Sequence, residues 1–291
     1  MQQAIQELQQ VIESALLSHL PQSRHPGAKS LDDAIHYAMF PGGKRLRPIL
    51  ALMGARIFSD DPRPALGAAC AVEYIHCSSL IFDDLPCMDD AAIRRGIPCV
   101  HKVYGEEVAW LAGIALLNQS YALFGKVPAL IAEATHCIGT EGMIGGQALD
   151  LAPHDGDEQA LLERSQNLVE RNKKTSAMMR LSLTAGALAL NVRPAEVEPL
   201  GVAGQALGEA YQIADDLLDV HATSKPAGQD QRHHRPTSGL FDEKAGFDQV
   251  NSLVTGARES IQSAYGNRAA ALLMAIDATF KAQLAEASHV S

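Results

Sequence analysis

The sequence predicts an all-α protein, folded as a single domain over residues 1–291. Apolar residues recur at intervals of three and four along most of the chain, and Pro or Gly interrupts this pattern at the expected turns. No segment of strand length alternates β-branched or aromatic residues with polar ones. Hydrophobic residues make up 47% of the 291 residues, which is enough for the core of one large domain or two small ones. We expect one domain of about ten to fourteen helices.

The N-terminal third of the chain holds four expected helices. The first is amphipathic, because one stripe collects its apolar residues: Ile5, Leu8, Val11, Ile12 and Leu16. Ser30 is a favourable N-cap for the second helix, which stops at the Pro-Gly-Gly of 41–43. Pro48 and Pro64 suit the first turns of the third and fourth helices, and the fourth runs through 65–82.

The rest of the chain is mostly rich in Ala and Leu. Helices are expected at 106–126, 128–151, 158–190 (with a break), 194–220 and, as two or three pieces, 246–286. The one long polar segment, 221–238, is rich in Pro, Gly, Ser, Thr and charged residues. We expect this segment to be a mobile loop of the active site.

Composition argues against several classes of function. The formal net charge is −10, whereas non-specific binding to nucleic acid needs a basic surface. The five cysteines form no CxxC pair, which favours reduced thiols in a cytoplasmic protein. The N-terminus lacks the basic and apolar regions of a secretory signal. No run of about 18 apolar residues indicates a transmembrane segment.

An acidic cluster follows the fourth expected helix. The stretch 80–90, LIFDDLPCMDD, holds four aspartates within eight residues, directly after an apolar run. Pro86 cannot lie inside a helix without kinking it, so the helix should end near Asp84. The residues after it should then curl back and bring Asp89 beside Asp83. Carboxylates held this close repel each other unless a cation lies between them.

A second acidic cluster, QIADDLLDV at 212–220, lies on a helix far downstream. Asp215 and Asp219 are four residues apart and share a face of this helix, and Asp216 lies beside them. Alone, such a pattern is common on solvated helix faces, but a second acidic cluster of similar build favours a shared metal site. Oxygen ligands without a neighbouring His or Cys favour Mg²⁺ over zinc, and Mg²⁺ usually binds substrate phosphate as well.

Basic residues are grouped at several points of this acidic chain. The segment 42–48, GGKRLRP, places three cations behind a glycine pair, at the start of a helix that favours an anion. His76 lies seven residues before Asp83, hence on the same face of the helix, and we expect it to contact a ligand. Further cations stand at Arg94, Arg95, Lys173, Lys174, Lys225, Arg232 and Arg235. Together these residues predict binding sites for diphosphate.

These motifs, taken in order, resemble a known family. GGKRLRP, DDLPCMD, RRGIPCVHKVYGE, GMIGGQALDL, KKTSA and QIADDLLD occur in the order found in the trans-prenyl diphosphate synthases, the short-chain farnesyl and geranylgeranyl diphosphate synthases. The resemblance covers about residues 28–240. It implies a helical bundle of the isoprenoid synthase type around a deep central cavity, a homodimer, and up to three Mg²⁺ ions that bridge the aspartates to an allylic diphosphate.

The resemblance also implies a role for each matching residue. The metal ligands would be Asp83, Asp84, Asp89, Asp215, Asp216 and Asp219. Isopentenyl diphosphate would be bound by Gly43, Lys44, Arg47, His76 and Arg95, and the allylic diphosphate by Arg94, Lys174, Lys225 and Arg235. Thr175 and Gln212 would face the reacting carbons and stabilise an allylic cation. The two substrates would be isopentenyl diphosphate and an allylic diphosphate (dimethylallyl, geranyl or farnesyl).

Product length can be argued from helix geometry. An isoprene unit is about as long as one helical turn, roughly 5.4 Å. The side chains one turn before Asp83 should therefore meet the growing tail, and they are the small Ser78 and Ser79. Many bacterial farnesyl synthases place an aromatic residue at the first of these positions. We therefore expect C20 products to be accessible, with C15 as the alternative.

Three other functions stay open at this point. A non-catalytic partner subunit would keep the scaffold and lose the chemistry, but both aspartate clusters are retained. A class I terpene cyclase needs no site for isopentenyl diphosphate, which the basic GGKRLRP segment predicts. Irregular coupling of two allylic units is left open by Phe82 and Ile114, which stand where the family commonly has His and Asp.

Overall fold

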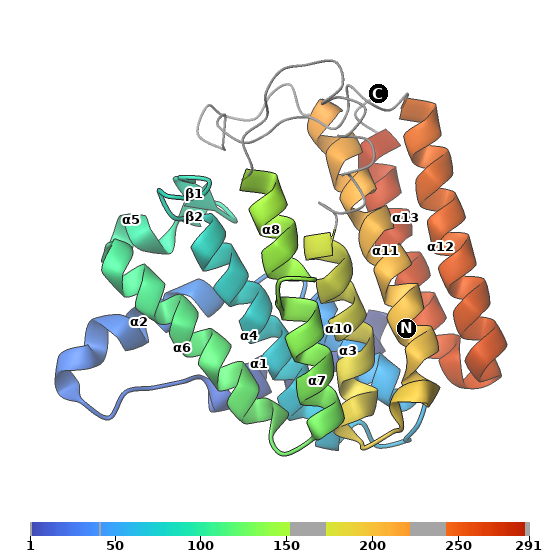
Figure 1. Cartoon of the computed structure of the whole chain (residues 1–291), viewed down its shortest axis with the longest axis horizontal. Helices are drawn as coiled ribbons and strands as arrows, with labels where there is room; N and C mark the ends of the chain where they lie inside the picture. Colours follow the sequence, from blue (N-terminus) through green and yellow to red (C-terminus); the bar gives the residue numbers. More distant parts are fainter. Residues whose placement is uncertain (1, 41, 152–172, 222–242, 289–291) are drawn as a thin grey trace.

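The computed structural model describes residues 2–40, 42–151, 173–221 and 243–288, and the all-α prediction is confirmed (Figure 1). The α-helices are α1 (Gln2–His19), α2 (Lys29–Met39), α3 (Leu46–Arg56), α4 (Leu66–Asp83), α5 (Val100–Tyr104), α6 (Glu106–Phe124), α7 (Pro128–Ile138), α8 (Met143–Leu151), α10 (Lys173–Ala189), α11 (Pro194–His221), α12 (Glu243–Tyr265) and α13 (Ala270–Ser288). Short 3₁₀ turns stand at Pro26–Ala28, Arg63–Ala65 and Gly266–Ala269. The described strands are β1 (Ile93–Arg94) and β2 (Ile97–Pro98).

Helix α10 lies in the middle of the bundle and packs against α3, α4, α7, α8 and α11 (Figure 1). Its side chains from 177 to 188 are all buried. Helix α4 packs on α6 toward one side of the bundle, and α11 packs on α12 toward the other. The C-terminal end of α4, the start of α10 and the last turns of α11 lie at the same end of the bundle. This end therefore collects both acidic clusters.

Three sequence expectations differ from the structure in detail. Helix α2 begins at Lys29 with Ala28 as its N-cap, so Ser30 is its second residue and not the cap. A 3₁₀ turn precedes this helix, and the side chain of His25 caps that turn by accepting a hydrogen bond from the N–H of Gly27. The helix expected at 128–151 is two helices, because the chain turns between Gly139 and Gly142. The helix expected at 158–190 is described only from 173 onward, and the loop at 221–238 lies outside the described residues except for His221, the end of α11.

A two-stranded hairpin follows the first acidic cluster and was not expected from the sequence. Ile93 pairs with Pro98 and Arg94 with Ile97. The two residues between the strands, Arg95 and Gly96, have φ of 53° and 80°, as in the two-residue turns that suit a hairpin. Strands of two residues are too short to give an alternating pattern, so the sequence carried little signal for them.

Helix α4, with the turn before it, is apolar enough to resemble a membrane span. The stretch Arg63–Asp83 meets the criteria of length and composition for such a span, although 67% of its apolar window is buried inside the bundle. Burial against α3, α6 and α10 accounts for this apolar composition. The described residues contain one stretch of this kind.

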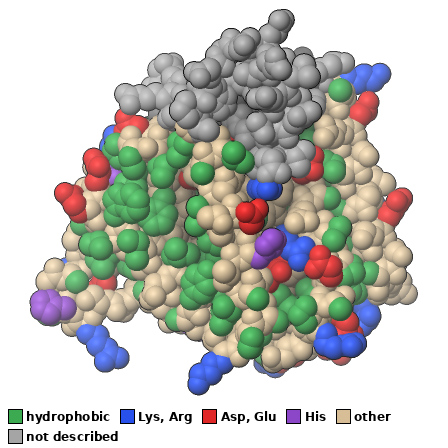
Figure 2. All heavy atoms as spheres, viewed as in Figure 1, with side chains coloured by type: hydrophobic (Ala, Val, Ile, Leu, Met, Phe, Trp, Pro, Cys, Tyr) green, Lys and Arg blue, Asp and Glu red, His purple; other side chains and the backbone are tan. Residues whose placement is uncertain are grey.

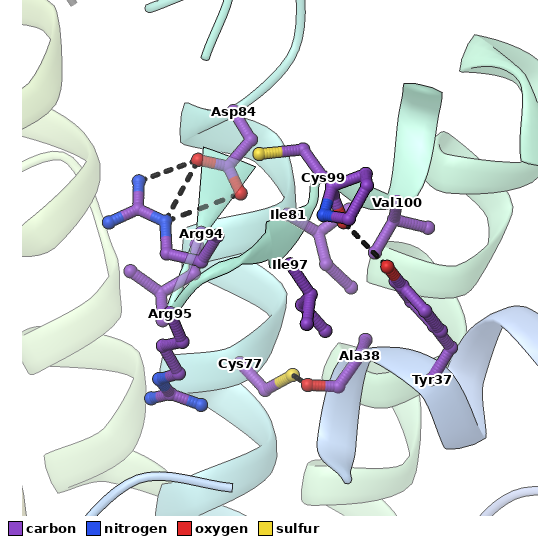
Figure 3. Close-up of a pocket in the computed structure, with 12 residues that line it drawn as sticks. Tyr37, Ala38, Cys77, Ile81, Asp84, Arg94, Arg95, Ile97, Cys99 and Val100 are labelled. Atoms are coloured by element: carbon purple, nitrogen blue, oxygen red, sulfur yellow. Dashed lines mark hydrogen bonds and ion pairs between the residues drawn. The ribbon is translucent and has the colours of Figure 1, made fainter. Parts of the chain in front are cut away.

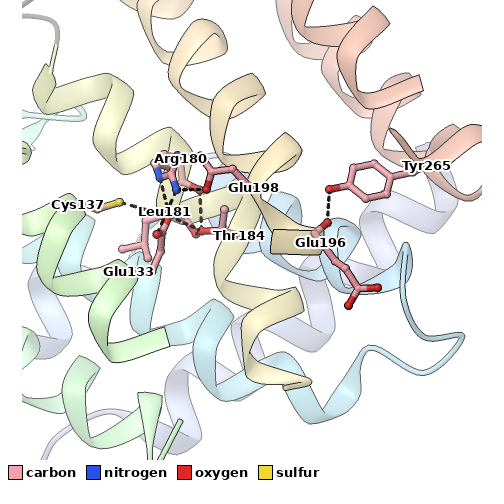
Figure 4. Close-up of polar contacts among 8 residues, drawn as sticks. All are labelled: Glu133, Cys137, Arg180, Leu181, Thr184, Glu196, Glu198 and Tyr265. Atoms are coloured by element: carbon pink, nitrogen blue, oxygen red, sulfur yellow. Dashed lines mark hydrogen bonds and ion pairs between the residues drawn. The ribbon is translucent and has the colours of Figure 1, made fainter. Parts of the chain in front are cut away.

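A partly buried ion-pair network fixes the middle of α10 to its neighbours (Figure 4). The guanidinium of Arg180 donates to Glu133 of α7 at 2.7 Å and to Glu198 of α11 at 2.8 Å. Thr184 donates to Glu133 as well, at 3.3 Å. Removing one member of such a network leaves the others buried without a partner, which costs more than the pair contributes. The network therefore specifies how α7, α10 and α11 fit together.

Glycines allow α10 to approach its neighbours backbone to backbone. A Cβ at Gly186 would overlap the carbonyl oxygen of Ala51 on α3, and one at Gly54 would overlap the carbonyl oxygen of Leu183. On α11, a Cβ at Gly204 would come within 2.7 Å of the Cα of Arg180. Backbone atoms cannot move aside as the end of a flexible side chain can. The close packing of α10 therefore requires glycine at these positions.

We expect Gly186→Ala to lower the free energy of unfolding by about 2 kcal/mol or more, because the new methyl group overlaps backbone. Gly256→Ala is the matched control, since Gly256 lies within α12 and a Cβ there would meet nothing within 4 Å. That change should raise the free energy of unfolding by about 0.5–1 kcal/mol, because Ala restricts the unfolded chain. Urea denaturation measures both. Equal effects of the two substitutions would contradict the close packing described for α10.

Candidate active site

The first acidic cluster lies where α4 ends. Asp84 is the C-cap of the helix, as the position of Pro86 predicted, and the next residues curl back so that the N–H of Asp89 donates to the carbonyl oxygen of Asp83 at 2.9 Å. Asp83 and Asp84 are buried, at 7% and 4% exposure. The turn therefore presents carboxylates that have lost most of their hydration, which is costly unless cations compensate them.

The positive charge of Lys174 compensates the negative charge of Asp83. Its Nζ lies 2.6 Å from Oδ2 of Asp83 and 2.6 Å from Oε1 of Gln147 on α8. Burial raises the pKa of Asp83, and the charge of Lys174 opposes this rise. A close backbone contact fixes the position of Lys174, because a Cβ at Gly146 of α8 would come within 2.6 Å of its backbone nitrogen. The first turn of α10 thus places the ammonium group of Lys174 beside the C-terminal end of α4.

Arg94, which lies on the hairpin, compensates the negative charge of Asp84. Its Nε and Nη2 lie 3.0 Å and 2.5 Å from Oδ1 of Asp84, and the pKa of Arg94 is raised by this pairing although burial opposes it. Figure 3 shows the guanidinium of Arg95 pointing the opposite way from that of Arg94. Both arginines line a small cavity with Cys77 and Cys99, of about 40 Å³. That volume holds a few water molecules and no prenyl chain.

The three basic residues of segment 42–48 do not share one role, because one of them makes structural ion pairs. Arg45 is buried and pairs with Glu13 of α1 at 2.7 Å and with Glu73 of α4 at 2.9 Å. It therefore anchors the segment between α1 and α4, and our expectation of three cations for a ligand is wrong for this residue. Gly43 lies against Arg95, since a Cβ there would come within 3.2 Å of the guanidinium.

Arg47 and His76 face each other at the base of this segment. Nη1 of Arg47 lies 3.4 Å from Nε2 of His76, and the Nε of Arg47 is buried without a hydrogen-bond partner among the described residues. Burial lowers the pKa of His76 well below its ordinary value, and Arg47, Arg95 and other nearby cations lower it further. The ring is therefore neutral at pH 7 and can accept a hydrogen bond from Arg47. A buried guanidinium with an unused donor is suited to bind an anion.

The second acidic cluster is joined to α10 by hydrogen bonds. Thr175 donates to Oε1 of Gln212 at 2.9 Å, and Nε2 of Gln212 donates to Oδ1 of Asp216 at 3.0 Å. Since Thr175 directly follows Lys174, the start of α10 reaches both acidic clusters. The charge of Asp215 acts on Arg47, whose pKa is lowered by burial and raised in part by Glu73, Tyr211 and Asp215.

Some expected site residues cannot be placed in this way. Lys225, Arg232 and Arg235 lie outside the described residues, and for Asp219 only its position within α11 is described. Ser78 is buried and donates to the carbonyl oxygen of Gly113 on α6 at 2.8 Å, and Ser79 donates to the carbonyl oxygen of His76 at 2.9 Å. No group of three or more His, Cys, Asp or Glu side chains in the described part of the chain could hold a metal ion by itself.

Two glutamines at the site were missed by the sequence reasoning. Gln147 binds Lys174, and it lies inside the quoted motif GMIGGQALDL, so the motif could have suggested it. Gln283 of α13 donates to Oδ1 of Asp215 at 2.7 Å. Its only signal is a polar residue on an otherwise apolar stripe of the last helix, where Leu272, Ile276 and Phe280 are buried.

Comparisons with known proteins agree on one family. The model of the polyprenyl synthetase family matches residues 28–246. A farnesyl diphosphate synthase of Geobacillus stearothermophilus is 36% identical, over 81% of this chain and 82% of its own. A geranylgeranyl diphosphate synthase of Cyanophora paradoxa is 34% identical over 93% of each chain. A solved geranyltransferase of Helicobacter pylori, complexed with magnesium and isoprenyl diphosphate, superimposes with a TM-score of 0.77 at 26% identity and covers 96% of this chain and 97% of its own.

Proposed function

This chain belongs to the polyprenyl synthetase family and is a short-chain prenyltransferase, and on that premise we propose how its residues carry out the reaction. The reaction we propose joins isopentenyl diphosphate to an allylic diphosphate. The allylic C–O bond breaks and diphosphate leaves. The double bond of isopentenyl diphosphate then attacks the allylic carbon, and transfer of a proton to the released diphosphate restores a double bond.

One observation carries this proposal: the start of α10 reaches both acidic clusters. Lys174 binds Asp83 on α4, and Thr175 reaches Asp216 on α11 through Gln212. Carboxylates from two distant parts of the chain therefore converge on one end of the bundle, among partly exposed basic groups. A solvated acidic helix face would not need cations placed against its carboxylates in this way.

The chemistry of the donors fits Mg²⁺. Asp83, Asp89 and Asp215 would hold the ions, with Asp84, Asp216 and Asp219 around them. Each cluster supplies carboxylate oxygens only, and Mg²⁺ is commonly held by one or two carboxylates together with substrate phosphates and water. When bound, Mg²⁺ supplies Lewis-acid stabilisation of the leaving diphosphate.

The cations of the site bind the two diphosphates. Arg47, His76 and Arg95, with Gly43 and Lys44, would take isopentenyl diphosphate, and the unused donor of Arg47 supports this role. Lys174 and Arg94 now bind Asp83 and Asp84, and they would turn to the allylic diphosphate when metal ions take over those carboxylates. Lys225 and Arg235, outside the described residues, would complete this set.

Thr175 and Gln212 would lie beside the reacting carbons. Both are uncharged and already held by hydrogen bonds, so their dipoles need little rearrangement when a cation forms. The helices around them are apolar: Ala177, Met178 and Met179 of α10 and Ile213 of α11 are buried. Such walls exclude water, which would otherwise trap the allylic cation.

We expect Asp83→Asn to lower kcat about 10³-fold or more, because a metal ligand that stabilises the leaving group is lost. Asp60→Asn is the matched control and should leave the rate unchanged, since Asp60 is exposed in the loop that follows α3. Turnover is measured with Mg²⁺, labelled isopentenyl diphosphate and each allylic diphosphate in turn. Chelation of Mg²⁺ should abolish it. An Asp83→Asn protein that keeps the wild-type rate would refute the proposed site.

We propose that the products reach C20, with C15 as the alternative, because the side chains one turn before Asp83 are small. Ser78→Tyr should then shorten the main product by at least one isoprene unit, as seen by chromatography of the dephosphorylated products. Ser78→Ala is the control and should leave the product length unchanged, since Ser78 is buried against Gly113 and Ala fits the same space. An active Ser78→Tyr protein with unchanged products would exclude Ser78 as the limit on length.

We propose a homodimer formed through an apolar surface that we call the α6 face, which consists of Val103 of α5 and of Trp110, Leu111 and Ile114 of α6. These side chains are 42–54% exposed, and Figure 2 shows hydrophobic side chains gathered over the side of the molecule that carries α6. Phe82 packs under this face, with its ring 5.1 Å from that of Trp110. The residues that replace the family's common His and Asp, Phe82 and Ile114, thus both add to an apolar surface.

Leu111→Glu should convert the dimer to a monomer at micromolar concentration, because it would place a charge inside an apolar interface. Val202→Glu is the control, because Val202 on α11 is 51% exposed and lies off the α6 face. Sedimentation velocity measures the oligomeric state of both proteins. A monomeric wild-type protein, or a Leu111→Glu protein that stays dimeric, would contradict this interface.

We also propose a cytoplasmic location. The five cysteines are free, and four of them are buried, as in proteins of reducing compartments. Detection of the protein in a membrane or exported fraction would contradict this.

A further inference from the structure

Gln283 reaches the second acidic cluster from the C-terminal helix. Its Nε2 lies 2.7 Å from Oδ1 of Asp215 and 3.3 Å from the carbonyl oxygen of Tyr211. Both acceptors belong to the same turn of α11, and the two hydrogens of one amide group can serve them together. One side chain of α13 therefore fixes both the backbone of this turn and the carboxylate that it carries.

The orientation of the amide is determined by these contacts. A carbonyl oxygen and a carboxylate oxygen can only accept, so the nitrogen of Gln283 must face them. The side chain is 7% exposed, and its Oε1 is buried without a hydrogen-bond partner among the described residues. A buried amide with an unused oxygen is costly to keep in a packed core. A purely structural role does not explain this cost, since a Leu or Met would pack the same stripe.

Gln283 also lies outside the segment that the family model covers. The family model ends at residue 246, before α13 begins, whereas α13 packs against α11 and α3. Leu272, Ile276 and Phe280 form the buried stripe of α13, and Gln283 continues this stripe one turn further. The contact with Asp215 is therefore made by a part of the chain that none of the family's motifs covers.

We propose that Gln283 is a positioning residue that holds the Asp215 carboxylate in the orientation needed to bind a metal ion. This inference rests on the proposed function. Donation to Oδ1 occupies one of the roughly four acceptor positions of a carboxylate and restrains its rotation. Groups that orient a metal ligand in this way commonly change metal affinity or activity by about 10–100-fold when they are removed.

The test replaces Gln283 by Met, which keeps an unbranched side chain of similar length and removes the donor. The matched control is Lys281→Met, because Lys281 is exposed on the same helix. Two quantities are measured for each protein: the Mg²⁺ concentration that gives half-maximal turnover, and the rise in melting temperature caused by Mg²⁺ with inorganic diphosphate. The second quantity needs no turnover. The KM for isopentenyl diphosphate is measured at saturating Mg²⁺.

We expect Gln283→Met to raise the Mg²⁺ concentration for half-maximal turnover about 10-fold or more. The rise in melting temperature with Mg²⁺ and diphosphate should shrink, and the KM for isopentenyl diphosphate should change less than about twofold, because Arg47 and His76 bind that substrate. Lys281→Met should match the wild type. A lower melting temperature of the metal-free protein with an unchanged Mg²⁺ requirement would make Gln283 a packing residue and overturn the inference.

The two proposals can fail separately. A wild-type protein without prenyltransferase turnover would refute the proposed function, and the melting measurement would still report whether Mg²⁺ and diphosphate bind. An active wild-type protein whose Mg²⁺ requirement does not respond to Gln283→Met would refute only the role of Gln283.

Discussion

The candidate site depends on how closely α10 approaches the helices around it. Lys174 and Thr175 are short distances from both acidic clusters only because glycines on α8 and α11 let the backbones nearly touch. A Cβ at Gly208, for example, would overlap the Cα of Ser176. The network around Arg180 fixes the same helix near its middle. Helix α10 is thus held along its length, and its first turn cannot move away from the carboxylates without disturbing the core.

Much of the fold could be predicted because helical periodicity and Pro or Gly breaks are local signals. The end of α4 at Asp83 followed from Pro86, and the two C-terminal helices followed from their apolar stripes. The hairpin at 93–98 could not be predicted, because a strand of two residues is too short to show the alternation of apolar and polar residues. The α7–α8 break was missed because both helices share a composition. The two helices are separated by a tight turn at 139–142, where a Cβ on Gly139 or Gly142 would overlap backbone carbonyl oxygens.

The sequence identified most residues of the candidate site, but it was less able to give each of them its role. Motif order brought together Asp83, Lys174 and Gln212, which hydrogen bonds now connect through α10. The grouping of basic residues at 42–48 did not separate Arg45 from Arg47, whereas the family resemblance gave a ligand role to Arg47 and none to Arg45. Arg45 meets Glu13 and Glu73, which lie far apart in the sequence. Gln283 was missed for the same reason, because its partner is on another helix.

The pairing of Lys174 with Asp83 and of Arg94 with Asp84 has a consequence for the order of loading. Metal ions that arrive alone would displace these two partly exposed cations from their carboxylates, and diphosphate alone would draw the cations away from Asp83 and Asp84. Either ligand by itself leaves like charges facing one another in a poorly hydrated space. Only joint arrival lets every charge exchange one partner for another. On the proposed function, Mg²⁺ and diphosphate should therefore bind together more tightly than either of them binds alone.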